Sequence, residues 1–287
     1  MKGDGGRGIG SRRVIAAVAL CIVVVASAPL VGEGVDWSTV LRPATLAFFQ
    51  LRNPYHAIGS LGPPWLFVIL APLAILPPAL GAIIIFWLNL GTWVFVTKKL
   101  GPGSLLNLLA VVTSPMVING LLARNVDFLV IWGLLLPPEV AVYFLALKPQ
   151  VGAGAMAYLA LTVYRTRGFR GLLRVFLLPC LVSALTFLAY GLKASDAKGT
   201  LGMPWNASPV ILLGWPSLLI GAILFTCAIM RHSPAEGARI SMAATPFFCP
   251  YVGTQSWISC LPALMRSKAL YIMWVMTWGW IVYVLVR

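Results

Sequence analysis

Long apolar stretches separated by short polar or basic ones run along almost the whole chain. A helix needs about 20 apolar residues to cross the hydrocarbon core of a bilayer, and fewer where it is short or tilted. The pattern therefore predicts an all-α fold, a polytopic transmembrane helix bundle of about eight to ten spans. The candidate segments are Val14–Gly32, Pro64–Leu76, Ala79–Thr97, Leu105–Leu122, Asp127–Leu147, Gly152–Tyr164, Val175–Leu192, Pro209–Met230, Ile240–Met265 and Ala269–Val286.

Several of these segments are expected to be broken or kinked. The second and the sixth are short enough to be half-helices or re-entrant pieces, and prolines interrupt many of the others. In a membrane, a broken helix is tolerated where its freed backbone groups face protein or water, so an internal cavity is expected. The interrupting prolines are Pro72, Pro115, Pro137, Pro138, Pro179, Pro216, Pro246 and Pro250.

The longest polar interruption is residues 33–63. Apolar residues recur there at helical spacing between Trp37 and Leu51, and polar residues lie opposite, namely Ser38, Thr39, Arg42, Thr45 and Arg52. This pattern predicts a helix that lies on the membrane surface. A second sizeable polar loop covers residues 193–208.

Composition supports the membrane assignment. Hydrophobic residues make up 60% of the 287 residues and charged residues only 10%, whereas soluble domains carry about 25% charged residues. We therefore expect one membrane domain, residues 14–287, after a short basic tail, residues 1–13. The net charge of +14 comes from basic residues between apolar segments, which is typical of positive-inside loops and not of a nucleic-acid surface.

The same basic residues predict an orientation. The tail and the loop containing Arg165 and Arg174 are both expected inside, which gives a multi-pass plasma-membrane protein with a cytoplasmic N-terminus and with residues 33–63 outside. Ten alternating spans also place Arg231 and Arg239 inside. They place four basic residues outside, against the rule: Lys98, Lys99, Arg266 and Lys268.

Two other patterns have ordinary interpretations. Arg12-Arg13 before an apolar run and Ala26-Ser27-Ala28 after it resemble a secretory signal, but Pro29 follows directly, so we expect an uncleaved first helix. The five cysteines lack the spacing of metal ligands or of a disulfide framework, so we expect them to be core residues.

Few acidic residues are available for chemistry. Glu33 and Asp36 follow the first apolar segment, where a carboxylate can act as a general base on a hydroxyl group. Asp127 and Glu139 fall at the edge of an apolar segment and within it, where a charge is expensive unless it is paired or solvated. Pro137-Pro138 before Glu139 predicts a break that brings this residue to water.

Basic residues near these acids are candidates for binding an anionic group. They are Arg42, Arg52, His56, Arg124 and Lys148. A phosphate needs fixed cationic donors, although each of these residues can instead extend its charge to lipid headgroups. The sequence contains no pattern typical of a nucleotide site or of a Ser-His-Asp triad.

The order of several motifs resembles glycosyltransferase family 87, whose members are C-type membrane glycosyltransferases. The resemblance rests on local sequences that span most of the chain. They are Gly34-Val35-Asp36-Trp37, Arg52-Asn53-Pro54-Tyr55, Gly62-Pro63-Pro64-Trp65, Ala71-Pro72-Leu73, Arg124-Asn125-Val126-Asp127, Leu147-Lys148-Pro149-Gln150 and the stretch Ser241–Leu264 with its two prolines.

The resemblance implies a C-type fold that transfers a sugar, with inversion, from a polyprenyl-phosphate donor to a lipid or glycan hydroxyl at the outer face. It implies that Asp36 is the general base. Lys148 and Arg124 are expected to stabilise the phosphate, and Arg52, His56, Gln150, Asp127 and Tyr55 are further expected substrate-binding residues. No cofactor is indicated; a divalent cation is left open, because Asp36 and Glu33 are too few to make a site.

An alternative class stays open. A non-enzymatic membrane protein, either a transporter of amphipathic lipids or an assembly subunit, can be built on the same broken-helix cavity. It predicts that Asp36 can be replaced without functional loss. No internal repeat is visible in the sequence, which disfavours the transporter.

Overall fold

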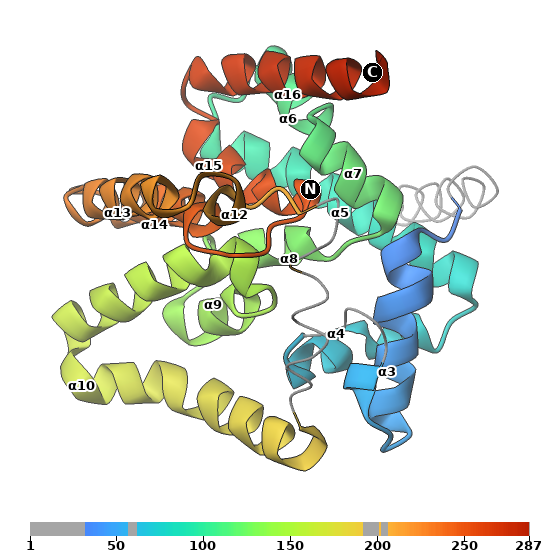
Figure 1. The fold of residues 1–287 in the computed structure, drawn as a ribbon. Coiled ribbons are helices and arrows are strands. Elements are labelled where there is room, and N and C mark those ends of the chain that lie inside the picture. The colour runs from blue at the N-terminus through green and yellow to red at the C-terminus, as the bar shows by residue number, and fades with distance from the viewer. Residues whose placement is uncertain (1–31, 57–61, 192–200, 202–205, 287) are drawn as a thin grey trace, which may run out of the picture.

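The computed structural model describes residues 32–56, 62–191, 201 and 206–286 (Figure 1). In these residues all regular structure is helical, so the predicted all-α class is confirmed there. The predicted first span, Val14–Gly32, lies outside the described residues apart from Gly32. Most of the polar loop 193–208 also lies outside them.

Two of the described helices are long and apolar enough to cross a membrane. These are α5 (Pro78–Leu100, 23 residues) and α10 (Pro149–Tyr190, 42 residues). A third candidate is a bent pair, α6 (Leu105–Val112) and α7 (Pro115–Ala123), whose axes differ by 54°. Shorter apolar helices are α4 (Pro64–Ala74), α13 (Trp215–Ile229) and α16 (Ala269–Val286).

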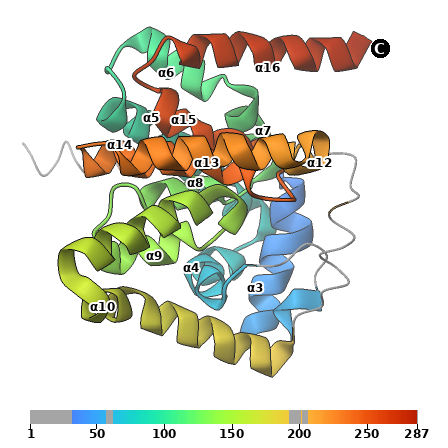
Figure 2. The same ribbon diagram turned by 60° about the vertical axis from the view of Figure 1, so that its left-hand side comes forward.

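The helix α10 is bent sharply at Gly168, which has a positive φ of 65° that only glycine adopts easily. Both views show a V (Figures 1 and 2). The bend divides the 42 residues into two arms of roughly 28 and 33 Å at 1.5 Å per residue. Exposed Arg165 and Arg174 lie around the bend, so the expected separation of two apolar segments by a basic turn is confirmed.

Four predicted segments are broken into shorter helices, as expected from the prolines that interrupt them. Leu105–Leu122 is broken before Pro115, because proline cannot donate the helical hydrogen bond and forces the preceding residue out of helical conformation. Ser114 is accordingly extended, with ψ of 140°. Asp127–Leu147 is likewise two short helices, α8 (Asp127–Trp132) and α9 (Pro138–Leu145).

The other two broken segments lie in the C-terminal third of the chain. Pro209–Met230 is split at Gly214 (φ 68°), which separates α12 (Pro209–Leu213) from α13. Ile240–Met265 is not one helix: it contains the end of α14 (Pro234–Ala244), two 3-10 helices and the short α15 (Leu261–Leu264). The 3-10 helices are η3 (Thr245–Phe247) and η4 (Thr254–Cys260).

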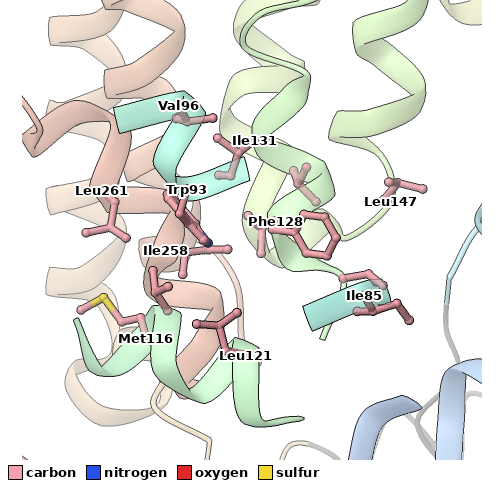
Figure 3. Packing of buried hydrophobic residues seen from close by; sticks show 14 of the residues in the cluster. Ile85, Trp93, Val96, Met116, Leu121, Phe128, Ile131, Leu147, Ile258 and Leu261 are labelled. Atoms are coloured by element: carbon pink, nitrogen blue, oxygen red, sulfur yellow. The ribbon is translucent and has the colours of Figure 1, made fainter. Parts of the chain in front are cut away.

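The main core forms where α5, α7, α8, η4 and α15 meet (Figure 3). Trp93 of α5 is fully buried, and Ile258 of η4 lies beside it, with Met116 of α7 beyond. Phe128 and Ile131 close the core from α8. The core thus fixes the start of α8 against the end of α7, where the charged residues of the next subsection lie.

The expected helix after Gly34 is present. It begins at Val35, widens into a π-helical turn, η1 (Trp37–Leu41), and continues as α3 (Arg42–Phe49). Its apolar face is buried through Trp37, Leu41 and Ala44, but Thr45, expected on the polar face, is also fully buried. In Figure 2 this helix runs across the direction of α13 and α16.

The first arm of α10 packs closely against α14, and α13 packs along the other side of α14 (Figure 2). Glycine allows this approach: a Cβ atom on Gly154 would lie 1.9 Å from the carbonyl oxygen of Ser241. The amide of Gly154 also donates to the hydroxyl of Thr245 (2.9 Å). Further along, Gly237 of α14 lies against the ring of Tyr158.

Basic side chains from distant segments meet at the end of α5. The carbonyl oxygen of Leu100 accepts hydrogen bonds from Arg266 Nε (2.7 Å) and Arg239 NH1 (3.4 Å). The alternating ten-span prediction separates these two arginines by the membrane, so it is wrong at this point. The physical reason is that the segment predicted to separate them, Ile240–Met265, is not one helix but the end of α14, η3, η4 and the short α15.

The cysteine prediction is also only partly right. Cys260 is buried, but Cys180 and Cys227 are exposed. They lie on outward faces of α10 and α13, among apolar residues such as Leu177, Leu181 and Ile223 that are also exposed. Apolar positions of a membrane-facing helix do not have to point to a protein core.

We expect Gly154→Ala to destabilise the protein. The added methyl group meets backbone, which cannot rotate away, so α10 and α14 must move apart at a cost of about 1–3 kcal/mol. The matched control is Gly91→Ala in α5, where nothing lies within 4 Å of the new Cβ. Thermal unfolding in detergent compares the two. Equal midpoints for both variants would contradict the close packing.

Candidate functional site

Five polar residues from four separate segments form one connected group, which we call the Asp36–Ser256 cluster. Asn125 donates to Asp36 Oδ2 (2.5 Å) and accepts from Lys148 Nζ (2.8 Å). Lys148 also forms an ion pair with Asp127 Oδ1. Ser256 completes the group, since its hydroxyl donates to Asp127 Oδ2 (3.0 Å). Residues far apart in sequence are therefore linked by direct contacts.

The position of Asp36 is fixed by its neighbours in sequence. Gly34 has a φ of 72° and lies so close to Ala123 and Arg124 that a Cβ atom would approach their atoms to 2.8 and 2.3 Å. On the other side, the indole nitrogen of Trp37 donates to the carbonyl of Pro78 (3.0 Å). The start of this helix is therefore held between the end of α7 and the start of α5.

Arg124 holds the same segment from the other direction. Its side chain is 1% exposed, NH2 donates to the carbonyl of Gly32 (3.1 Å), NH1 donates to Leu121, and the guanidinium stacks over the ring of Phe86. With these contacts Arg124 anchors the chain before Asp36. It does not face an open site, which counts against the expected contact with a substrate phosphate.

Asn125 contacts Asp36, Lys148 and the backbone of Asp127 because of the turn in which it lies. The backbone of Arg124 is left-handed (φ 58°), which ends α7 as glycine often does. Asn125 Oδ1 then accepts from the amide of Asp127 (2.8 Å), at the first residue of α8. Lys148 comes to the same place because it is the residue before Pro149, where α10 begins.

Asp127 and Lys148 form a partly buried ion pair. Asp127 is 2% exposed and Lys148 19% exposed. Removing a carboxylate from water costs several kcal/mol unless it is paired and hydrogen-bonded. Asp127 satisfies this condition with Lys148 and Ser256.

Asp36 differs from Asp127 in its access to solvent. It is half-buried, and burial raises the pKa of its carboxyl above the ordinary value of 3.8, while Lys148 and the hydrogen bond from Asn125 lower it by less. In the described part of the chain its second oxygen, Oδ1, accepts no hydrogen bond. A carboxylate with a raised pKa and a free oxygen is suited to accept a proton.

Lys148 retains donor capacity beside that carboxylate. Its ammonium group has three N–H donors, of which the described contacts, to Asn125 and Asp127, use two. The third remains for a further acceptor, and the side chain reaches the surface. The cluster thus presents a proton acceptor and a cationic donor on the two sides of one asparagine.

A small cavity lies behind the cluster. Its polar lining comes from Asn125 and Asp127, from Gln255, and from Asn89 and Trp93 of α5. The Oδ1 atom of Asn89 and the indole nitrogen of Trp93 are buried without a hydrogen-bond partner. The cavity extends the polar lining into the core.

The other expected site residues lie apart from the cluster. Gln150 is half-buried in the first turn of α10, next to Lys148 in sequence. Arg52, Tyr55 and His56 follow the far end of α3, about 20 Å from Asp36 at 1.5 Å per residue along the helix. Arg52 and His56 are exposed there, and Arg52 bonds to Gln50.

Tyr55 belongs to a separate aromatic cluster, and its ring is buried with Phe67 and packed by Phe187. Its hydroxyl has no partner, and burial raises its pKa to about 12. Nearby, the side chain of Asn53 donates to the carbonyl of Tyr190 (2.9 Å). This cluster joins the end of α3 to the end of α10. The structure therefore does not bring Tyr55 to Asp36.

Two members of the cluster were not predicted as site residues. Asn125 lies inside one of the quoted motifs, and an amide two residues before a helix-starting aspartate is a recognisable turn signal. No comparable sequence signal marks Ser256. In the described residues no three His, Cys, Asp or Glu side chains gather in a way that could hold a metal ion.

Comparisons of the sequence with protein-family models and curated proteins, and of the fold with solved structures, found no match. The resemblance to glycosyltransferase family 87 therefore stays a prediction from the motifs. What the geometry adds is that three of its residues, Asp36, Asp127 and Lys148, belong to one cluster.

We expect Lys148→Met to destabilise the protein by about 3 kcal/mol, because it leaves Asp127 buried without its counter-charge. The double variant Asp127→Asn with Lys148→Met removes both charges and should recover most of the loss. Chemical unfolding in mild detergent measures both. A double variant no more stable than the single one would show that the ion pair is not what Lys148 contributes.

Asp36 should make stability depend on pH. Because its pKa is raised in the folded protein, the folded state binds this proton more tightly than the unfolded state does. The free energy of unfolding should therefore fall as pH rises from 3.8 through the raised value, and then level off. Asp36→Asn keeps an acceptor for Asn125 and should remove this fall, whereas Glu33→Gln, at an exposed neighbour, should retain it. Thermal unfolding midpoints of the intact protein and of both variants, measured across this pH range, test the prediction.

Proposed function

We propose that the protein is a membrane glycosyltransferase that moves a sugar from a polyprenyl-phosphate donor to the hydroxyl of a lipid or glycan acceptor. Asp36 is the general base in this proposal. Lys148 binds the phosphate that leaves. Asn125, Asp127 and Ser256 keep these two groups in place.

The observation that carries the proposal is the contact of Asn125 with both Asp36 and Lys148. One amide group donates to the carboxylate at 2.5 Å and accepts from the ammonium at 2.8 Å. An acceptor hydroxyl and a donor phosphate must lie within a few ångströms of each other when a sugar is transferred between them. A base and a cation fixed by one side chain meet this requirement.

The proposed reaction is a single displacement. The acceptor oxygen attacks the anomeric carbon while Oδ1 of Asp36 takes its proton. The bond between the anomeric carbon and the phosphate oxygen breaks, and polyprenyl phosphate leaves with the electron pair. Lys148 stabilises the leaving phosphate with its third N–H. Attack opposite the leaving group inverts the anomeric centre.

The proposed setting is the outer face of the plasma membrane in a multi-pass protein of C-type architecture. Apolar helices long enough to cross a bilayer support it. The helix of η1 and α3, which begins at Val35 beside Asp36, supports it too, because it runs across the direction of α13 and α16. A lipid-linked donor would reach Lys148 from the membrane surface. Membrane lipids are therefore partners in this proposal, and nucleic acids are not.

The test is transfer of radiolabelled sugar from polyprenyl-phosphate donors by membranes that contain the intact protein or Asp36→Asn. We expect the variant to lose about 10²–10⁴-fold in rate, the usual contribution of a general base. Glu33→Gln, which removes a neighbouring exposed carboxylate, should keep nearly full activity. The activity of the intact protein should increase with pH as Asp36 loses its proton.

Two results would redirect the proposal. Equal transfer by the intact protein and by Asp36→Asn, at equal protein level, would remove Asp36 from the reaction. Absence of transfer from every polyprenyl-phosphate donor offered would favour the non-enzymatic alternative, in which the Asp36–Ser256 cluster only stabilises a transporter or an assembly subunit.

A further inference from the structure

The length of helix α5 gives the distance between the side of the protein that holds Asp36 and the end at Leu100. Trp37, next to Asp36, bonds to Pro78 at the first residue of α5, and Arg266 and Arg239 bond to Leu100 at its last. These ends are about 33 Å apart at 1.5 Å per residue. This separation matches the hydrocarbon thickness of a bilayer, about 30 Å.

Exposed cations surround the Leu100 end. Lys98 and Lys99 lie in the last turn of α5, and Lys268 follows Arg266 by two residues; all four are exposed. In the described residues, the carboxylate that reaches this group is Glu236, 3.9 Å from Arg239. Arg266 uses only its Nε on Leu100. In the described contacts its two terminal nitrogens make no hydrogen bond, and a guanidinium offers them to a phosphate as a planar fork.

The bend of α10 brings more cations to the same end. The first arm of α10 is antiparallel to α14, because Gly154 lies at Ser241 and Tyr158 at Gly237. Continuing along both helices places the bend beside the start of α14. Arg165, Arg170, Arg174 and Arg231 are exposed in these two turns. In Figure 2 the bend lies at the left and α3 at the right.

We propose that this basic end is a docking surface for the phosphates of an anionic phospholipid leaflet. The surface consists of Lys98, Lys99, Arg165, Arg170, Arg174, Arg231, Arg266 and Lys268. Charge complementarity carries the proposal: basic residues border apolar helices at one end, and in the described chain two carboxylates pair with cations there, Glu236 with Arg239 and Glu139 with Arg167. Since the cytoplasmic leaflet is the anionic one, this end faces the cytoplasm and Asp36 lies on the opposite side.

The proposal also removes the conflict between the ten-span prediction and the positive-inside rule. With α4, of 11 residues, too short to cross, α5 runs from the side of Asp36 to the cytoplasmic side. Because Ile240–Met265 is not one crossing helix, Arg266 and Lys268 lie at the same end as Arg231 and Arg239. Together with Lys98 and Lys99 they then obey the positive-inside rule. The orientation does not depend on the transferase reaction, and its failure would leave that reaction untouched.

The first test is binding of fluorescent phosphatidylglycerol, with phosphatidylcholine as the uncharged reference, to the full-length protein in neutral detergent. The variant Lys98→Gln, Lys99→Gln, Lys268→Gln removes three exposed cations that make no described hydrogen bond or ion pair. We expect weaker phosphatidylglycerol binding, by about fivefold per lysine, the factor that corresponds to ~1 kcal/mol for each. Arg52→Gln, at an exposed cation near the far end of α3, is the matched control and should change little.

The second test addresses orientation. In a variant without the natural cysteines, Lys99→Cys and Thr39→Cys are labelled in intact cells with a membrane-impermeant maleimide. We expect labelling of Thr39→Cys before lysis and of Lys99→Cys only after it. Labelling of both positions in intact cells, or phosphatidylglycerol binding unaffected by the three lysine substitutions, would overturn the proposal.

Discussion

The carboxylate of Asp127 is only 2% exposed and lies within an apolar helical bundle. The residues around it are positioned so that this buried charge is paired. Lys148 must come from the start of α10, Ser256 from η4, and Asn125 from the turn before α8. Each contact joins elements that apolar packing alone would leave free to slide. Because interactions in a low-dielectric interior depend strongly on geometry, the pair fixes the register of these elements. Asp36 is positioned as a result, through Asn125.

The breaks in the helices make this convergence possible. A continuous helix from Leu105 to Leu122, or from Asp127 to Leu147, would carry its polar ends to opposite surfaces. Proline at 115 and 138 starts new helices instead, so α8 and α9 leave the cluster and return to it. The left-handed Arg124 turns the chain between α7 and α8. Glycine has the complementary role: Gly34 and Gly154 admit backbone contacts that any side chain would prevent.

Charge is divided between the two ends of α5. The acidic and amide groups of the cluster are near its start, and exposed arginines and lysines gather at its end. In the proposed setting this division has two uses. The basic end binds anionic headgroups and orients the protein. The other end keeps a carboxylate with a raised pKa at the face where a lipid-linked donor would be used.

The sequence by itself determined the helical class, the apolar segments and the basic turn at Arg165–Arg174, because these depend on local composition and periodicity. It also identified Asp36, Asp127 and Lys148 as candidate site residues. Only the tertiary structure decided which charges meet. The link through Asn125 and Ser256, the burial of Arg124 and the separation of Tyr55 from Asp36 are contacts between distant segments. The meeting of Arg239 and Arg266 at Leu100 was equally beyond the sequence, because it depends on the breaks within Ile240–Met265, and an apolar pattern does not distinguish one span from several short helices.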